Sequence, residues 1–339
     1  MTPSKAAPLL EYLKPLRSYL DDPNVTEVCI NSPGQILTEG REGWNFHEAP
    51  GMTFERCTQL AKLIATFSQQ SIDQQNPIIS ATLPQGERVQ VVIPPAVRPG
   101  TVSLTIRRPA NVIMTLDDYE KAGAFENVKD TTSDIMEHEE TLLELKKQRR
   151  FKEFLGLAVK EKQNIIVSGS TGSGKTTLMR SLLGLVPTDE RLLSIENVDE
   201  LKLHESHPNS VSLFYSAGGQ GVANVTQQHL IESALRMKPD RVFLAELIRG
   251  DEAFYYLRNV NSGHPGSITS MHANNARLAI EQLVLFLKES ASGSTMSRED
   301  IKQLIFMCVD VIVQIKKIGR KRIVTEIYYD PLFKRQLMA

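Results

Sequence analysis

At 339 residues, of which 41% are hydrophobic and 23% charged, the chain has an ordinary globular composition and room for about two domains. Its formal net charge of -1 excludes the strong overall positive charge that drives non-specific binding of nucleic acid. Its longest apolar runs are too short to span a membrane. The three scattered cysteines form no C-x-x-C pair, and the N-terminus lacks the apolar run of a secretory signal. These features predict a protein of a reducing, cytosolic compartment.

The first 110 residues predict a small α+β domain. Apolar residues at helical spacing indicate a helix over 4–20, and Thr53 is placed to cap a second helix that reaches Phe67. Short strands are expected at 25–31, 35–39, 44–47, 88–93 and 102–107.

Residues 111–150 change character and predict a linker followed by a charged helix. The stretch 134–152 has an acidic half before a basic half and only a narrow apolar stripe. We expect its charges to form a solvated helix face with i,i+4 pairs.

Residues 151–339 alternate short apolar strands with helical stretches. Strands are expected at 164–168, 191–196, 210–214, 241–245, 266–271 and 309–316, and a final hairpin pairs 309–316 with 322–329 around Gly319. This pattern predicts a mostly parallel sheet covered by helices on both faces. In such a sheet, ligands bind beyond the carboxyl ends of the strands.

A phosphate-binding loop follows the first of these strands. Its sequence fits G-x-x-x-x-G-K-[ST], with a strand before it and a helix after it. The glycines let backbone N–H groups approach a phosphate chain, and the helix beginning near Gly174 adds the positive end of its dipole. Lys175 is expected to reach the β- and γ-phosphates, and the Thr176 hydroxyl to ligate Mg²⁺. The sequence therefore predicts ATP binding by Gly169, Ser170, Thr171, Gly172, Ser173, Gly174, Lys175, Thr176 and Thr177.

Hydrolysis also needs acids near the metal and the attacking water. Glu246 ends the strand 241–245 and is expected to hold the metal's water shell, without the Asp that many proteins of this fold carry at the position of Ala245. Glu196 and Glu200 follow another strand, and either could polarise the water. His272 falls at the carboxyl end of its strand, the side of a parallel sheet where nucleotide binds, and it is therefore expected to sense the γ-phosphate. A zinc site is not expected, because no Cys or further His lies at ligand spacing.

The motifs occur in one order: 169–176, then 195–201, then 235–241 leading to Glu246, then 262–267 with His272. Together they resemble the Walker A, Asp box, Walker B and His box of the secretion-superfamily hexameric ATPases, and most closely the traffic ATPases of bacterial type IV secretion systems. Residues 86–95 and 103–109 also resemble that family. The resemblance implies a RecA-like second domain and a homohexamer with nucleotide in the cleft between the two domains. It further implies that the nucleotide site includes Arg88, Arg107, Arg108 and His264.

This resemblance implies that ATP hydrolysis drives substrate translocation or pilus biogenesis in a conjugation-type secretion system. Implied partners are other secretion ATPases and inner-membrane components, with indirect contact to translocated DNA or protein, and the implied location is cytoplasmic and peripheral to the inner membrane. Two positions depart from the family: Asn197 replaces the usual Asp, and 246–249 is one residue longer than the usual run.

The alternative functions are a type II secretion or type IV pilus ATPase, and a nucleotide-gated scaffold with slow turnover. The segment 216–220 resembles an ABC signature loop, but that class does not fit the Ala-Glu strand end or the two-histidine box; we instead expect 218–221 to face the pore of the ring.

Overall fold

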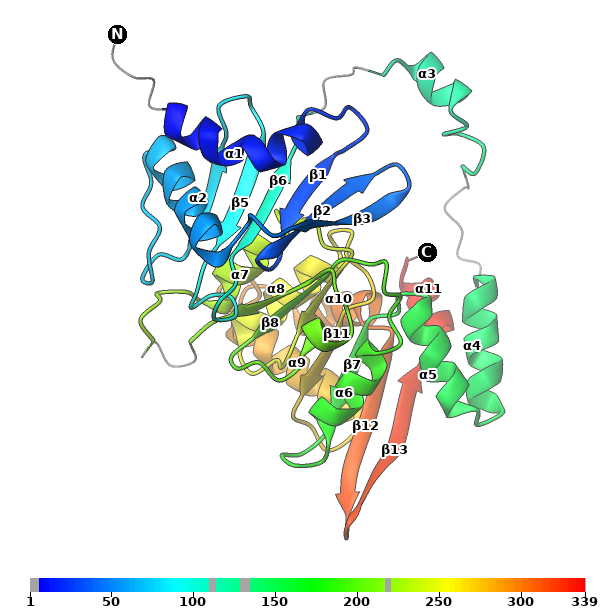
Figure 1. The fold of residues 1–339 in the computed structure, drawn as a ribbon. Helices are drawn as coiled ribbons and strands as arrows, with labels where there is room; N and C mark the ends of the chain where they lie inside the picture. The colour runs from blue at the N-terminus through cyan, green and yellow to red at the C-terminus, as the bar shows by residue number, and fades with distance from the viewer. Residues whose placement is uncertain (1–5, 110–113, 129–134, 217–220, 339) are drawn as a thin grey trace.

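The computed structural model describes residues 6–109, 114–128, 135–216 and 221–338. It contains two domains that pack against each other and are joined by a long connection (Figure 1). The predicted class, a RecA-like α/β domain preceded by a smaller α+β domain, is confirmed. None of the described helices combines the length and the apolar character that crossing a membrane requires.

The first domain is a six-stranded antiparallel sheet with two helices on one face. The helices are α1 (Ala7–Leu20) and α2 (Phe54–Phe67), and the side chain of Thr53 caps α2 as predicted. The strands run in the order β3-β2-β1-β6-β5-β4. Their bounds are β1 (Glu27–Ile30), β2 (Gly34–Gly40), β3 (Gly43–Ala49), β4 (Ile78–Thr82), β5 (Arg88–Val92) and β6 (Ser103–Arg107).

The central strands of this sheet are buried on both faces because the second domain covers the face that the helices leave open. Val28 and Ile30 of β1 pack with the helices. On the opposite face, Gln90 of β5 donates to the Ser233 hydroxyl (2.8 Å), and Val92 packs into the core of the second domain. Because side chains alternate between the two faces along each strand, the sheet has an apolar face that packs on α1 and α2 and a more polar face that packs on the other domain.

The connection between the domains carries an isolated helix, α3 (Leu116–Lys121), which lies apart from both domains (Figure 1). Beyond it, α4 (Glu137–Lys147) and α5 (Phe151–Lys160) pack together against the second domain. The expectation of a solvated charged face is wrong at Glu139. This residue of α4 is buried and accepts hydrogen bonds from Arg335 (3.0 Å) near the C-terminus.

The second domain is built on two adjoining groups of strands, in which all pairs are parallel except the antiparallel pair of β12 and β13. One group has the order β11-β7-β12-β13 and the other β10-β8-β9, and a parallel bridge between Leu247 and Met271 connects them. Six predicted strands and the final hairpin are confirmed. Their bounds are β7 (Ile165–Ser168), β8 (Leu192–Glu196), β9 (Ser210–Phe214), β10 (Arg241–Leu244), β11 (Ile268–Met271), β12 (Val311–Ile318) and β13 (Lys321–Tyr329).

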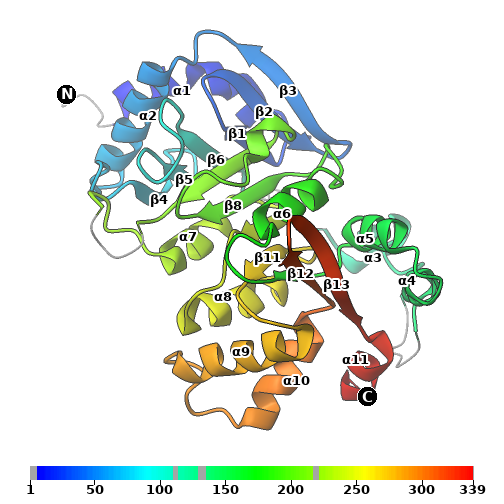
Figure 2. The ribbon, with the colours of Figure 1, turned by 90° about the horizontal axis from the view of Figure 1, so that it is seen from below.

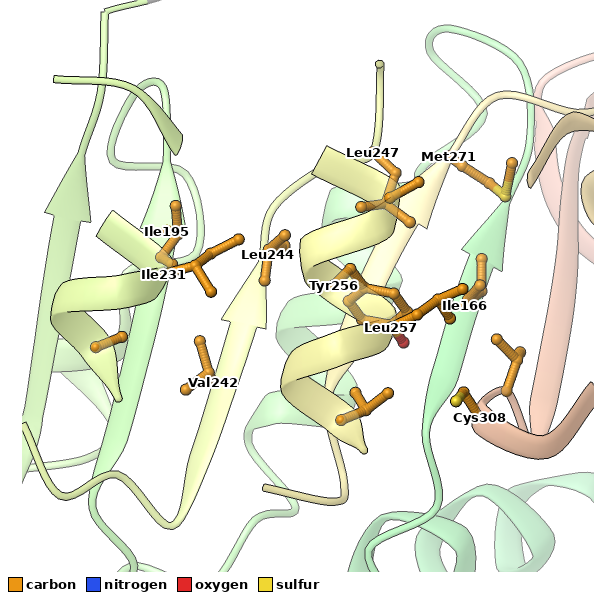
Figure 3. Packing of buried hydrophobic residues seen from close by; sticks show 14 of the residues in the cluster. Ile166, Ile195, Ile231, Val242, Leu244, Leu247, Tyr256, Leu257, Met271 and Cys308 are labelled. Carbon is orange, nitrogen blue, oxygen red and sulfur yellow. The ribbon is translucent and has the colours of Figure 1, made fainter. Parts of the chain in front are cut away.

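Helices cover both faces of this sheet (Figure 2). One core contains Ile166, Val242 and Leu244 of the strands with Tyr256 and Leu257 of a covering helix (Figure 3). The other contains Ile165 and Val167, which point to the opposite face and pack with α5 and α6. The helices are α6 (Lys175–Leu183), α7 (Gln227–Ala234), α8 (Gly250–Val260), α9 (Ala276–Glu289), α10 (Arg298–Cys308) and α11 (Pro331–Met338), with a short 3-10 turn at Leu203–Glu205.

Candidate functional site

The phosphate loop leaves the end of β7 and enters α6, as predicted. Gly172 and Gly174 have φ angles of 73° and 99°, in the left-handed region that favours glycine. Gly169 is required for a different reason: a Cβ atom there would lie 2.4 Å from the carbonyl oxygen of Ile315 in β12. Thr176 and Thr177 occupy the first turn of α6, whose free N–H groups can bind an anion.

Lys175 folds back over this loop. Its Nζ atom donates to the carbonyl oxygens of Gly169 (3.1 Å) and Ser170 (3.4 Å), and lies 3.8 Å from a carboxylate oxygen of Glu246. Burial lowers the pKa of Lys175, and the Glu246 carboxylate partly offsets this effect. A buried ammonium group held mainly by carbonyl oxygens is placed to bind an anionic ligand.

Glu246 and His272 meet Lys175 at the same edge of the sheet. Glu246 follows β10 and His272 follows β11, and the His272 Nε2 atom lies 2.9 Å from the Glu246 carboxylate. Because β7 and β11 are parallel, with Ser168 opposite Met271, their following loops emerge together. The structure thus brings together three residues from separate motifs.

The structure distinguishes between the two candidate acids after β8. Glu196 is fully buried and its oxygens accept hydrogen bonds from the Ser194 hydroxyl (2.5 Å) and from the backbone N–H groups of Glu200 (2.9 Å) and Leu201 (2.8 Å). Burial raises the pKa of Glu196 despite these donors. Glu200 instead accepts a hydrogen bond from the Thr176 hydroxyl (3.3 Å). Glu196 therefore supports the loop, and of the two only Glu200 faces the phosphate-loop helix.

The oxygen groups here suit a magnesium ion that is shared with a phosphate chain. Mg²⁺ prefers oxygen ligands and is usually held by one or two protein groups together with substrate phosphates. The Thr176 hydroxyl and the Glu200 carboxylate lie side by side, and Glu246 is close to Lys175. Within the described ranges, no group of three or more His, Cys, Asp or Glu side chains is arranged to hold a metal without such a ligand.

The basic residues expected to reach the nucleotide lie elsewhere in the chain. Arg88 and Arg107 face each other across β5 and β6 and line a cavity of about 930 Å³ with Lys238 and His264. Arg107 also approaches the Glu27 carboxylate (3.6 Å). Arg108 donates to backbone carbonyls of the first domain, including that of Val25 (2.9 Å).

His264 and Lys238 show which side of the second domain this cavity borders. His264 precedes β11 and Lys238 precedes β10, so both lie at the amino ends of parallel strands. His272 and the phosphate loop lie at the carboxyl ends. We call the lining Arg88, Arg107, Arg236, Lys238 and His264 the cationic cavity. Within one chain, the structure does not bring it to the phosphate loop.

Two further features follow from the structure. Arg249 occupies the N-cap position of α8, and the Glu252 carboxylate accepts from the backbone N–H groups of Ile248 (3.0 Å) and Arg249 (3.1 Å). Sequence reasoning missed the hairpin β12–β13 as part of the site, although it packs against Gly169 and Gly174. The basic run 316–322 is visible in the sequence, but its position beside the loop is not. The predicted pore-facing segment 218–221 falls largely outside the described residues.

Comparisons with known proteins show which family the chain resembles over nearly its whole length. The family described as Type II/IV secretion system protein matches residues 141–315. The type IV secretion system protein VirB11 of Bartonella henselae is 44% identical, over 98% of this chain and 95% of the relative. VirB11 of Brucella suis is 42% identical, over 98% and 93%. A crystal structure of the VirB11 ATPase from the Brucella suis type IV secretion system, in complex with sulphate, is similar with a TM-score of 0.91 and 41% identity, covering 97% of this chain and 100% of that one.

Proposed function

Because the chain belongs to the VirB11 family of type IV secretion ATPases, we propose that it hydrolyses ATP at the phosphate-loop edge to drive secretion as a homohexameric ring. The predicted family and ATPase activity are confirmed. The observation that carries the site assignment is the convergence of Lys175, Glu246 and His272 at one edge of the sheet. The sequence identity to type IV secretion ATPases favours this function over a type II secretion or pilus ATPase.

In the proposed site, Lys175 binds the β- and γ-phosphates in place of the carbonyl oxygens that it now contacts. Thr176 and Glu246 would hold Mg²⁺ with its bound water, and Glu200 would polarise the water that attacks the γ-phosphate. When bound, Mg²⁺ would neutralise charge that develops on the phosphoryl oxygens. His272 is connected to Glu246 and so would report the γ-phosphate to the residues after β11. The sulphate bound by the Brucella suis relative is consistent with an anion site in this family.

The position of the cationic cavity supports the ring. The phosphate loop and this cavity lie at opposite edges of the same sheet, so one chain cannot apply both to one nucleotide without rearrangement. In a ring of head-to-tail contacts, one face of each copy meets the opposite face of the next. Such a ring would bring Arg88 and Arg107 of one copy to the nucleotide of its neighbour.

Mixing two inactive variants tests this arrangement. Lys175→Ala should abolish turnover, and Arg107→Ala should strongly reduce it, because each removes a positively charged side chain that stabilises the transferring phosphoryl group. If the arginine acts on the neighbour, random mixing restores about a quarter of the interfaces to an intact pair. ATPase activity above the sum of the two variants measured separately is the expected result. Activity that stays at the sum of the two variants would contradict action between copies, and normal activity of Lys175→Ala would contradict the site itself.

A motor and a slow, nucleotide-gated scaffold need the same pocket, so turnover has to be separated from binding. Glu246→Gln should retain ATP binding and block hydrolysis. If substrate transfer by a secretion system carrying this variant stops, the motor is supported, and if transfer continues the scaffold is correct. The proposed location is the cytoplasmic side of the inner membrane, beside the other components of the system; fractionation of cells that express the chain tests it.

A further inference from the structure

The hairpin β12–β13 contacts the proposed nucleotide site on two sides, at the phosphate loop and at the segment that follows His272. The Ile315 carbonyl covers Gly169. Nearer the turn of the hairpin, where Arg322 pairs with Lys317, the Arg322 side chain lies over Gly174, and a Cβ atom on Gly174 would be 2.7 Å from the Arg322 Cδ atom. Gln314 donates to the carbonyl oxygen of Ala273 (3.1 Å), directly after His272. The hairpin projects beyond the second domain next to β7 and α6 (Figure 1). The hairpin is therefore part of the site.

Arg322 occupies a position that is unfavourable for a cation unless an anion is bound there. Gly174 caps α6, so the Arg322 side chain lies at the positive end of this helix dipole. No carboxylate among the described residues lies within ion-pair distance of Arg322, which is exposed. By contrast, Arg180 near the other end of α6 pairs with Glu205 (2.8 Å).

Glu326, on the same strand as Arg322, shows the usual arrangement at a helix start. Its carboxylate accepts from the backbone N–H of Ala276 (2.8 Å), the first residue of α9. An acid at this position is favourable because it faces unpaired N–H groups. The hairpin thus presents an acid to the start of α9 and a cation to the start of α6. A phosphate chain on the loop would give the cation its missing partner.

We propose that Arg322 binds the phosphate chain of the nucleotide from within the same chain, on the side where the α- and β-phosphates lie. The proposal rests on the nucleotide site proposed above. The backbone of a phosphate loop cradles the α- and β-phosphates, and Arg322 lies against that backbone. A guanidinium group offers five N–H donors in a fixed fork that suits phosphate oxygens. Arg322 is then a cis ligand of the nucleotide, whereas the cationic cavity acts from a neighbour.

Titration calorimetry of the full chain with Mg-ADP and Mg-ATP tests this role. Arg322→Gln should weaken the binding of both nucleotides roughly 10- to 150-fold, the range expected for the loss of a charge-assisted hydrogen bond. Both should weaken to a similar extent, because they share the α- and β-phosphates. In steady-state kinetics, KM for ATP should rise while kcat changes little, the signature of binding that is equal in the ground and transition states.

The matched control is Lys321→Gln. It removes the same charge from the adjacent residue, whose side chain points to the other face of the strand, and it should leave both affinities within about twofold of wild type. Arg322→Lys keeps the charge without the fork and should bind with intermediate affinity. Equal affinities for wild type and Arg322→Gln, or equal losses in Lys321→Gln and Arg322→Gln, would overturn the proposal. Normal ADP and ATP affinity of Lys175→Ala would instead overturn the nucleotide site, so the two failures can be distinguished.

Discussion

Arg191 joins the two domains and provides a direct test of how they pack. Arg191 immediately precedes β8 and is fully buried, and its Nε atom donates to the Met237 carbonyl oxygen (2.8 Å). Its Nη1 atom donates to the side-chain oxygens of Asn31 (2.9 Å) and Asn209 (2.6 Å), of which Asn31 belongs to the first domain. Trp44, also from the first domain, lies with its ring centre 5.4 Å from the guanidinium carbon. One side chain therefore holds groups from both domains.

The cost of Arg191→Ala can be estimated from the acceptors that it leaves. The Asn209 oxygen keeps a donor in the Asn31 amide, but the Met237 carbonyl, the Asn31 oxygen and the Thr105 hydroxyl oxygen lose theirs. Each buried acceptor left without a partner costs about 1–3 kcal/mol, so the three together cost about 3–9 kcal/mol. The cavity left by the side chain adds to this cost unless water fills it.

Urea unfolding followed by tryptophan fluorescence measures this loss where it occurs, because Trp44 is the single tryptophan of the chain. The matched control is Arg180→Ala, the same change at an exposed ion pair with Glu205, which should cost less than about 1 kcal/mol. Arg191→Ala should lower the midpoint far more than the control and change the emission of Trp44 in the folded state. An Arg191→Ala midpoint equal to that of the control would refute this account of the domain junction.

Three further outcomes are expected. Burial raises the pKa of Glu27 from 4.5 to about 7, so between these pH values the folded chain keeps a proton that the unfolded chain has released. The free energy of unfolding should therefore fall by about 3 kcal/mol as pH rises from 4.5 to 7. Glu27→Gln should remove this fall, which urea midpoints measured from about pH 4.5 to 8 would show. Glu196→Gln should reduce ATPase activity roughly tenfold or more while leaving the chain folded by circular dichroism, since the amide cannot accept all the hydrogen bonds that hold the loop; unchanged activity would show that the loop needs no such support. Gly169→Ala should abolish nucleotide binding in calorimetry, because its Cβ atom would clash with the Ile315 carbonyl, whereas the control Gly156→Ala meets no atom within 4 Å and should bind normally.

Local motifs made much of the site predictable. The phosphate loop needs only a strand, a glycine-rich turn and a helix in sequence, and these were all readable around Lys175. Parallel topology then placed Glu246 and His272 at the same edge, because each follows a strand of the same sheet. The sequence could not choose between Glu196 and Glu200, since that choice depends on which of them is buried.

Contacts between distant segments explain the rest. The buried pair of Glu139 and Arg335 joins residues 196 apart, so the sequence shows only a charged run where the structure has one buried acid. The strand β4 was not predicted, because Ile78–Thr82 lacks a clear alternation, and it is pairing with β5 that determines its conformation. The position of Arg322 likewise depends on a hairpin folding back onto a loop nearly 150 residues earlier.

The separation of the phosphate loop from the cationic cavity has a mechanical consequence if the ring is correct. A nucleotide bonded to Lys175 of one copy and Arg107 of the next contributes binding energy to the interface between them. Only interactions that differ between ATP and the products can shift the relative position of the two copies. The γ-phosphate is the group that differs. In the proposed site Lys175 and His272 would contact it, whereas Arg322 would contact the phosphates that ADP retains. Arg322 would then keep the nucleotide in its own chain during turnover, while release of the γ-phosphate would change the contacts with Lys175, with His272 and with the neighbour.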